Sequence, residues 1–192
     1  MKGFIIAAAL AALAQGASAQ TLSEKEARGQ VFDHKRTSLQ ISSSLSAQDE
    51  ATIKAIVPLM AQQYRQPANY YSAIAFHPAD GLVSESLQAA LNHHSPEAAS
   101  RAALAACAAA TKSAGSCVIA AQIVPRGWKP RDFTLSQTAT EALRGLYRKA
   151  KSPKALAISP ATGVWAIGAG EAAALADCAS KGASDCEVRV RD

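Results

Sequence analysis

The sequence predicts an α+β fold made of two related strand–strand–helix–strand (ββαβ) units, in which helices cover one face of mostly antiparallel sheet. A nine-residue segment at 73–81 recurs at 155–163 with five identical positions. An alanine-rich segment at 102–108 recurs at 173–179 with six of seven positions identical, and a second cysteine follows each copy. Alanine makes up 45 of the 192 residues, so one match could arise by chance, but three in the same order indicate an internal repeat.

Residues 1–19 are predicted to be a signal peptide. They carry Lys2, then an apolar stretch over 4–14, and end in small residues, where Ala17-Ser18-Ala19 fits a cleavage site. The apolar stretch is too short to span a bilayer, so no transmembrane segment is expected after cleavage. We expect an exported chain, located in the periplasm or outside the cell.

Residues 20–66 are predicted to form a polar segment followed by a helix. The serine-rich stretch 20–44 is either a loose helix or a tail. Ser46 is a candidate N-cap for a helix over 47–65, which Pro58 should kink. Its inward face is expected to carry Ile53, Ile56, Val57, Met60 and Tyr64.

The first ββαβ unit is predicted over residues 67–128. Its expected elements are a strand at 70–76, a weak returning strand at Leu82-Val83, a helix at 96–110 and a continuous apolar strand at 117–124. Pro78 ends the first strand and Gly81 permits the turn. Ser95 and Pro96 are typical of a helix start. The returning strand is weak because this copy carries an insertion at 83–94.

A linking helix is predicted within residues 129–152 and the second unit over 153–192. The linking helix, at 136–151, is expected to bury a stripe of Ala139, Ala142, Leu143, Leu146 and Tyr147. The second unit is expected to contain strands at 155–159 and 164–167, a helix at 169–180 and an alternating strand at 186–191. Trp165 lies in the middle of a strand and is predicted to be a core residue.

Four cysteines in an exported chain predict two disulfides. Three connectivities are possible. The repeat favours Cys107–Cys117 with Cys178–Cys186, because each bond would join the end of a helix to the start of the next strand. A four-cysteine metal site or a nucleophilic thiol is the alternative, although the spacings do not match metal knuckles.

One segment is a candidate binding surface. Arg126, Lys129 and Arg131 flank Trp128, an arrangement that can bind an acidic polymer or anionic headgroups. The alternative is a linker whose tryptophan packs on the core. Cleavage would remove Lys2 and leave 19 Lys and Arg against 15 Asp and Glu, a net charge of +4, which is too small to indicate nucleic acid as a partner.

A second group of candidate residues is polar. His77, Asp80, His93 and His94 could converge on a metal or support hydrolysis, whereas the alternative is histidines in solvated loops. The run Gly168-Ala169-Gly170 opens a dinucleotide-like pattern, but small residues that let a helix pack closely on a strand explain it better. No cofactor is therefore expected.

The pattern Ala-Ile-Ala-x-x-Pro-x-x-Gly at 73–81, the Leu-Ala-x-Cys helix end at 104–107 and the strand that begins at Cys117 resemble an uncharacterised family of small secreted bacterial domains. The likeness spans residues 70–190. It implies ββαβ units with a helix–strand disulfide, and no activity. Similar chains are sometimes labelled 5-aminolevulinate synthase, an enzyme that needs a large pyridoxal-phosphate fold in the cytoplasm, so this short exported chain is not expected to have that activity.

The function expected from these observations is that of an exported, disulfide-stapled envelope protein. A non-catalytic binding or structural module fits best, with an acidic envelope component or another exported protein as its partner. The alternatives are a small exported hydrolase, and an inhibitor or accessory subunit of an exported enzyme.

Overall fold

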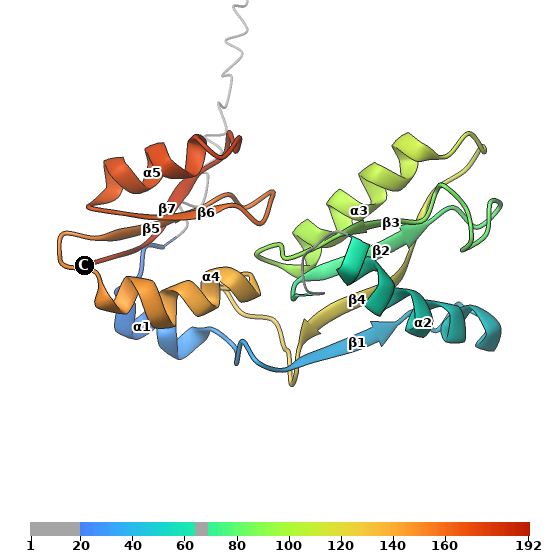
Figure 1. Ribbon diagram of the computed structural model, residues 1–192, viewed down its shortest axis with the longest axis horizontal. Coiled ribbons are helices and arrows are strands. Elements are labelled where there is room, and N and C mark those ends of the chain that lie inside the picture. The colour runs from blue at the N-terminus through green and yellow to red at the C-terminus, as the bar shows by residue number, and fades with distance from the viewer. Residues whose placement is uncertain (1–19, 64–68) are drawn as a thin grey trace, which may run out of the picture.

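The computed structural model describes residues 20–63 and 69–192. The predicted signal peptide and Tyr64 lie outside these residues. Figure 1 shows two lobes, each built on one antiparallel sheet, and the α+β prediction is confirmed.

The first lobe contains a four-stranded sheet of order β1-β4-β2-β3. Its elements are β1 (Thr37–Ile41), α2 (Ala47–Gln63), β2 (Ser72–Phe76), β3 (Gln88–Ala90), α3 (Pro96–Ala110) and β4 (Val118–Pro125). The second lobe contains a three-stranded sheet of order β6-β5-β7. Its elements are α1 (Glu24–Gln30), α4 (Gln137–Ala142), the π-helical turn η1 (Leu143–Tyr147), β5 (Ala155–Ile158), β6 (Trp165–Gly168), α5 (Glu171–Ala179) and β7 (Glu187–Arg191).

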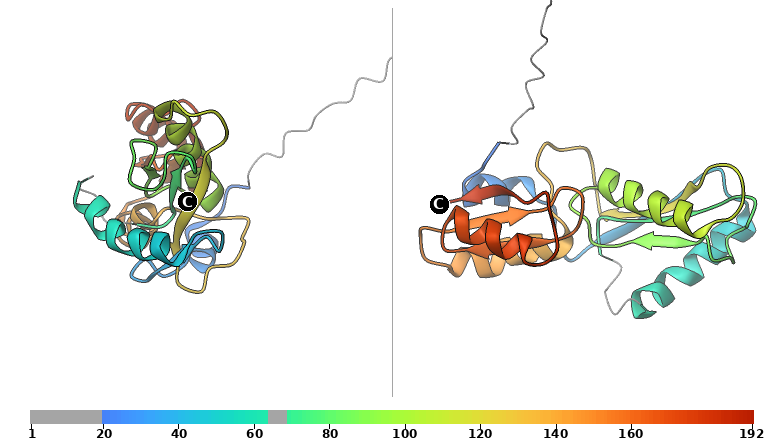
Figure 2. Two further views of the ribbon diagram at one scale, coloured as in Figure 1. Left: turned by 90° about the vertical axis from the view of Figure 1, so that its right-hand side faces the viewer. Right: turned by 90° about the horizontal axis from the view of Figure 1, so that it is seen from above.

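The two lobes share an arrangement of strands. β2 lies between β3 and β4, as β5 lies between β6 and β7. The register of β2 against β4 shifts between Ile74 and Ala75, and that of β5 against β7 shifts between Leu156 and Ala157. These are matching positions of the two nine-residue segments. In the view from above in Figure 2, α3 and α5 lie on the same side of their sheets.

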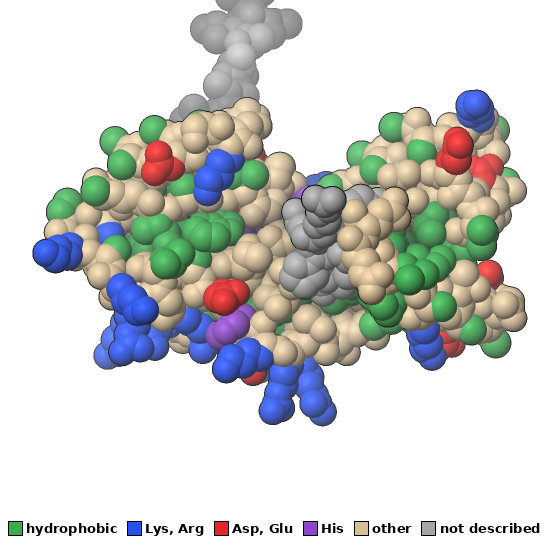
Figure 3. All heavy atoms as spheres, in the orientation of Figure 1, with side chains coloured by type: hydrophobic (Ala, Val, Ile, Leu, Met, Phe, Trp, Pro, Cys, Tyr) green, Lys and Arg blue, Asp and Glu red, His purple; other side chains and the backbone are tan. Residues whose placement is uncertain are grey.

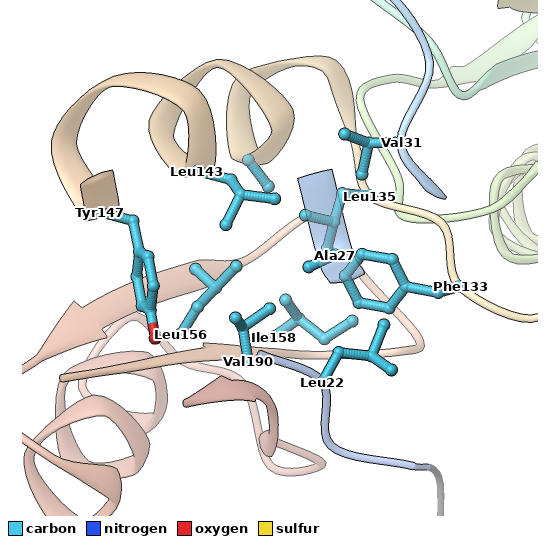
Figure 4. Packing of buried hydrophobic residues seen from close by; sticks show 11 residues of the cluster. Leu22, Ala27, Val31, Phe133, Leu135, Leu143, Tyr147, Leu156, Ile158 and Val190 are labelled. Carbon is cyan, nitrogen blue, oxygen red and sulfur yellow. The ribbon is translucent and has the colours of Figure 1, made fainter. Parts of the chain in front are cut away.

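Helices cover both faces of each sheet, which corrects the expectation of one covered face. α3 packs on one face of the first sheet and α2 on the other. α5 covers one face of the second sheet, while α1 and the α4–η1 segment cover the other, as Figure 4 shows in detail. The reason lies in the central strands: β2 and β5 are buried along their whole lengths, so both of their faces need apolar cover.

The returning strand of the first lobe is β3, within the insertion, and not Leu82-Val83. Leu82 is buried under α2, whereas Val83 is 88% exposed. The Oγ of Ser86 accepts a hydrogen bond from the backbone N–H of His77 at 3.1 Å, which holds residues 82–87 as a loop before the strand begins. β3 then pairs with Ala73–Ala75 of β2.

The N-terminal stretch 20–44 contributes one element to each lobe. It contains a short helix and a strand, whereas the sequence predicted a loose helix or a tail. Leu22 forms a parallel bridge to Val190 of β7, and Ser23 is the N-cap of α1, where it forms a capping box with Glu26. The chain then crosses to the first lobe, where β1 pairs antiparallel with β4. No strand was predicted at β1, because it is a largely polar edge strand.

The linking helix is interrupted by a π-helical turn. α4 begins at Ser136, whose Oγ accepts the N–H of Ala139, but the chain then makes the π-helical turn η1. A π turn holds more residues than an α turn and therefore changes the phase of the apolar stripe. Leu146, expected on the buried stripe, is 63% exposed, while Tyr147 is fully buried.

The predicted disulfides are confirmed. Cys107 is bonded to Cys117 and Cys178 to Cys186. Cys107 and Cys178 are fully buried in the clusters beneath α3 and α5. Gly168 allows α5 to approach β6 closely, because a Cβ at this position would overlap the backbone nitrogen of Ala174.

Candidate functional site

The candidate polar residues separate into two pairs at opposite ends of β2. His77 directly follows the strand, together with the turn that holds Asp80. His93 lies at the other end, where its backbone exchanges hydrogen bonds of 2.7 and 3.2 Å with Tyr71. Five strand residues span about 16 Å, so the pairs cannot share a ligand. Over residues 20–63 and 69–192 no group of three His, Cys, Asp or Glu residues is placed to hold a metal.

The first pair fixes a loop. The Nδ1 of His77 accepts the N–H of Ala79 at 3.3 Å. Asp80 accepts hydrogen bonds from the hydroxyls of Ser113 and, at 2.7 Å, Thr111, and these bonds lower the pKa of its carboxyl. The pair therefore anchors the loop between α3 and β4, which the Cys107–Cys117 bond also closes.

The second pair lies where the lobes meet. The Nδ1 of His94 accepts the N–H of Ser136 at 3.0 Å, so its proton resides on Nε2, which donates to the carbonyl of Val164 at 2.9 Å. Burial lowers the pKa of His94 to about 4. Burial also lowers the pKa of His93, whose Nδ1 lies 3.2 Å from the carbonyl oxygen of Leu91.

These bonds decide the chemistry of two imidazoles. In His77 and His94 the lone pair on Nδ1 already accepts a backbone N–H, and the proton on Nε2 occupies the other nitrogen. A general base needs a lone pair that faces the reacting group. Both rings therefore act as structural hydrogen-bonding groups in this conformation.

The segment around Trp128 divides between core and surface. Trp128 packs against the cluster beneath α3, and its Nε1 is buried with no hydrogen-bond partner among the described residues. The guanidinium of Arg131 lies 3.7 Å from the centroid of the Phe32 ring and donates to the carbonyl of Gln30. Only Arg126 and Lys129 project into solvent.

Arg131 reveals a larger arrangement, because Phe32 and Gln30 belong to a segment about a hundred residues earlier in the chain. The same two segments also meet through Arg144, which donates to the carbonyl of Val31 at 3.4 Å, and through the N–H of Arg126, which donates to the carbonyl of Arg36 at 3.0 Å. Residues 20–36 and 125–154 thus lie side by side. We call the surface that they form the basic face.

Charge is concentrated on the basic face. Its two segments contain twelve Lys and Arg against five Asp and Glu, a net charge of +7. The other described residues contain six against ten, a net charge of −4. In Figure 3 the cationic side chains gather along the lower edge of the second lobe and beneath the connection between the lobes. Its exposed members are Lys25, Arg28, Lys35, Arg36, Arg126, Lys129, Arg148, Lys149 and Lys151.

A cavity of about 600 Å³ lies within the basic face, between α1 and η1. Lys25, Arg28 and Arg144 line it together with two carboxylates, Glu24 and Asp192. Glu24 is bound at 3.0 Å by the buried Lys154, and this bond lowers the pKa of its carboxyl. The carboxylate of Asp192 lies 3.0 Å from the hydroxyl of Tyr147. Both acids thus have partners within the fold. Arg28 is also paired with Glu24 at 3.3 Å, while Lys25 is exposed at the rim of the cavity.

Sequence reasoning found only the part of the basic face around Trp128. The remaining cations are spread over α1, η1 and the chain that follows each. The contact between residues 20–36 and 125–154 brings them together, and no local pattern in the sequence encodes that contact.

Comparisons with known proteins identify no relative of this chain. The chain matches no family model, no curated protein and no solved structure. Within the described residues, no helix is both long enough and apolar enough to cross a membrane.

Proposed function

We propose that this protein is an exported, non-catalytic binding module that attaches to an anionic component of the cell envelope through the basic face. The observation that carries the proposal is the charge of +7 on two segments that are distant in sequence and adjacent in space. Repeated negative charges on a partner would meet several cations at once, an attraction that is strong at low salt and screened as salt rises.

Three further observations support the proposal. Both disulfides suit an oxidising compartment, as expected of an exported chain. The Nδ1 atoms of His77 and His94 each accept a backbone N–H, which favours binding over hydrolysis. Lys25, Arg28 and Arg144 line a cavity in the basic face, and the buried Lys154 binds the Glu24 carboxylate beside them.

The test compares two triple variants of equal net charge. Lys35, Arg126 and Lys129 are exposed on the basic face, and Lys54, Arg101 and Lys112 are exposed elsewhere. We expect serine at the first three positions to weaken binding to long-chain polyphosphate by about tenfold or more at low salt, since each cation near an anionic surface contributes about 1 kcal/mol. The second triple variant should bind nearly as the wild type does. Equal losses in the two variants would show that net charge alone governs binding and would refute a localised site.

A further inference from the structure

An apolar groove borders the basic face on the second lobe. It lies between η1 and β6, has a volume of about 440 Å³ and is lined by Ala142, Gly145, Leu146 and Trp165, with Lys149 and Glu141 at its rim. Figure 3 shows hydrophobic side chains gathered on this face between α4 and α5, with cationic side chains along its lower border. The groove and the basic face share Lys149, so one partner can touch both.

Leu146 is the most exposed apolar side chain of this groove. It is 63% exposed because the π turn rotates it away from the core. Trp165, across the groove, is half-buried: its Nε1 donates to the Thr138 hydroxyl at 3.1 Å, which fixes the ring. An exposed leucine thus lies beside a fixed, partly exposed tryptophan.

Gly145 keeps the groove open. A glycine inside a helix costs about 0.5–1 kcal/mol relative to alanine. Neither of the usual structural reasons for glycine applies, since its φ is not positive and a Cβ would meet nothing within 4 Å. Its effect on the surface is to leave the space between Leu146 and Trp165 unfilled.

Cationic side chains lie around the apolar lining of the groove. Lys149 is exposed at the rim, and Arg148 and Lys151 lie beside it. The Nζ of Lys181 lies 5.1 Å from the centroid of the Trp165 ring and donates to the Trp165 carbonyl. Glu141 is the single acid in the lining. An apolar floor with a cationic rim complements a partner that carries acyl chains beneath anionic headgroups.

We propose that the anionic partner is a membrane surface rich in anionic lipid, on which the protein docks peripherally with Leu146 and Trp165 in the interface. The inference rests on the proposed function and names the partner of the basic face. A soluble acidic polymer would need only the cations, whereas this surface adds a leucine and a tryptophan. Tryptophan favours the level of the headgroups, and lysines beside it reach anionic phosphates.

The first experiment compares substitutions at two leucines of nearly equal exposure. Leu146 is 63% exposed in the groove and Leu59 is 61% exposed on α2 of the other lobe. Binding is measured by co-sedimentation with vesicles of phosphatidylcholine, with and without phosphatidylglycerol. We expect Leu146→Asp to weaken binding to the phosphatidylglycerol vesicles by about tenfold or more, because it removes the leucine that would enter the membrane interface and adds a negative charge. Leu59→Asp should bind as the wild type does.

The second experiment locates Trp165 directly. The chain has two tryptophans, and Trp128→Phe leaves Trp165 alone while it removes a buried N–H that has no partner among the described residues. The fluorescence of Trp165 should shift to shorter wavelength on phosphatidylglycerol vesicles, and lipids brominated near the headgroup should quench it. Polyphosphate should produce neither effect.

The outcomes separate the two proposals. Equal vesicle binding by Leu146→Asp and Leu59→Asp would overturn the membrane inference and leave a charge-only site. So would polyphosphate binding without vesicle binding, or self-association in solution that Leu146→Asp abolishes. Failure of the wild-type protein to bind either polyphosphate or vesicles would refute the proposed function itself. Circular dichroism and intact disulfides in each variant confirm that the fold is retained.

Discussion

The Nε2 of His94 lies 2.9 Å from the carbonyl oxygen of Val164, and this bond joins the two lobes. His94 precedes α3 of the first lobe, and Val164 precedes β6 of the second. The N–H of Ser136, at the start of α4, donates to the other nitrogen of the same ring. One neutral imidazole therefore holds three segments together, and we call this contact the lobe junction.

Acid should weaken the fold through His94. Its pKa is 6.5 in the unfolded chain and about 4 in the folded one, because burial disfavours the charged ring. Between these values the unfolded chain carries a proton that the folded chain does not, so stability falls as pH falls from 6.5 to about 4. Over this pH range the free energy of unfolding should fall by about 3 kcal/mol because of His94. Urea unfolding at a series of pH values measures it.

His94→Gln is the test of this pH dependence, since glutamine can still donate to Val164 but does not titrate. We expect the pH slope between 6.5 and 4 to become shallower in this variant, with a residual slope from His93, whose pKa is also lowered by burial. His34→Gln, outside the lobe junction, is the control. The pKa of Asp80 is lowered below 3.8, so its contribution is lost only at lower pH. An unchanged slope in His94→Gln would contradict the assignment.

Each disulfide should stabilise its lobe by roughly 2–3 kcal/mol. The bonds close loops with sequence separations of 10 and 8 residues, and the loop-entropy relation gives about this value for loops of that length. Replacement of Cys178 and Cys186 by serine should lower the free energy of unfolding by that amount or more, because Cys178 is fully buried. Urea titration of the oxidised proteins measures the difference. A loss below 1 kcal/mol would show that the unfolded chain is already compact near this loop.

Local signals in the sequence predicted the elements that local interactions form. Ser95 and Pro96 correctly placed the start of α3, and the internal repeat correctly paired the disulfides. Burial of β2 and β5 on both faces was readable in their continuous apolar runs, yet the helices that supply the second layer come from outside the repeat.

Longer-range effects could not be read from the sequence in this way. β1 has the polar residues of an edge strand, and its position depends on pairing with β4, some eighty residues later. Leu146 was assigned to the core because an α-helical period was assumed, and the π turn breaks that period. The basic face depends on contacts such as Arg131 with Gln30, which link segments a hundred residues apart.

Two glycines should respond to alanine in opposite directions. Gly168→Ala places a Cβ against the backbone nitrogen of Ala174, and backbone cannot move aside without a shift of α5, so we expect destabilisation of about 2 kcal/mol or more. Gly145→Ala meets nothing within 4 Å and should stabilise the protein by about 0.5–1 kcal/mol through helix propensity. Thermal or urea unfolding of both variants measures the signs. The same sign for both would contradict the packing described around β6.

The lobe junction should make the two lobes unfold together. Besides the His94 contacts, the side-chain amide of Asn92 donates to the Thr138 hydroxyl at 2.8 Å, and the N–H of Gln137 donates to the carbonyl of Tyr70 at 2.8 Å. If one lobe opened alone, these bonds would be lost and a buried imidazole would be exposed. Amide hydrogen exchange of β2 and β5 should therefore report the same free energy of opening.

Gly163→Ala provides the perturbation for that measurement. Gly163 precedes β6 and lies against the carbonyl of Asn92 so closely that a Cβ would overlap its oxygen. The added methyl group should force the lobes apart, so the free energies of opening measured in β2 and β5 should diverge, with the smaller three-stranded sheet opening first. Gly145→Ala, whose added Cβ meets nothing within 4 Å, should keep the two values equal. Different values in the wild type, or equal values in Gly163→Ala, would show that the lobes are stable independently of the contacts between them.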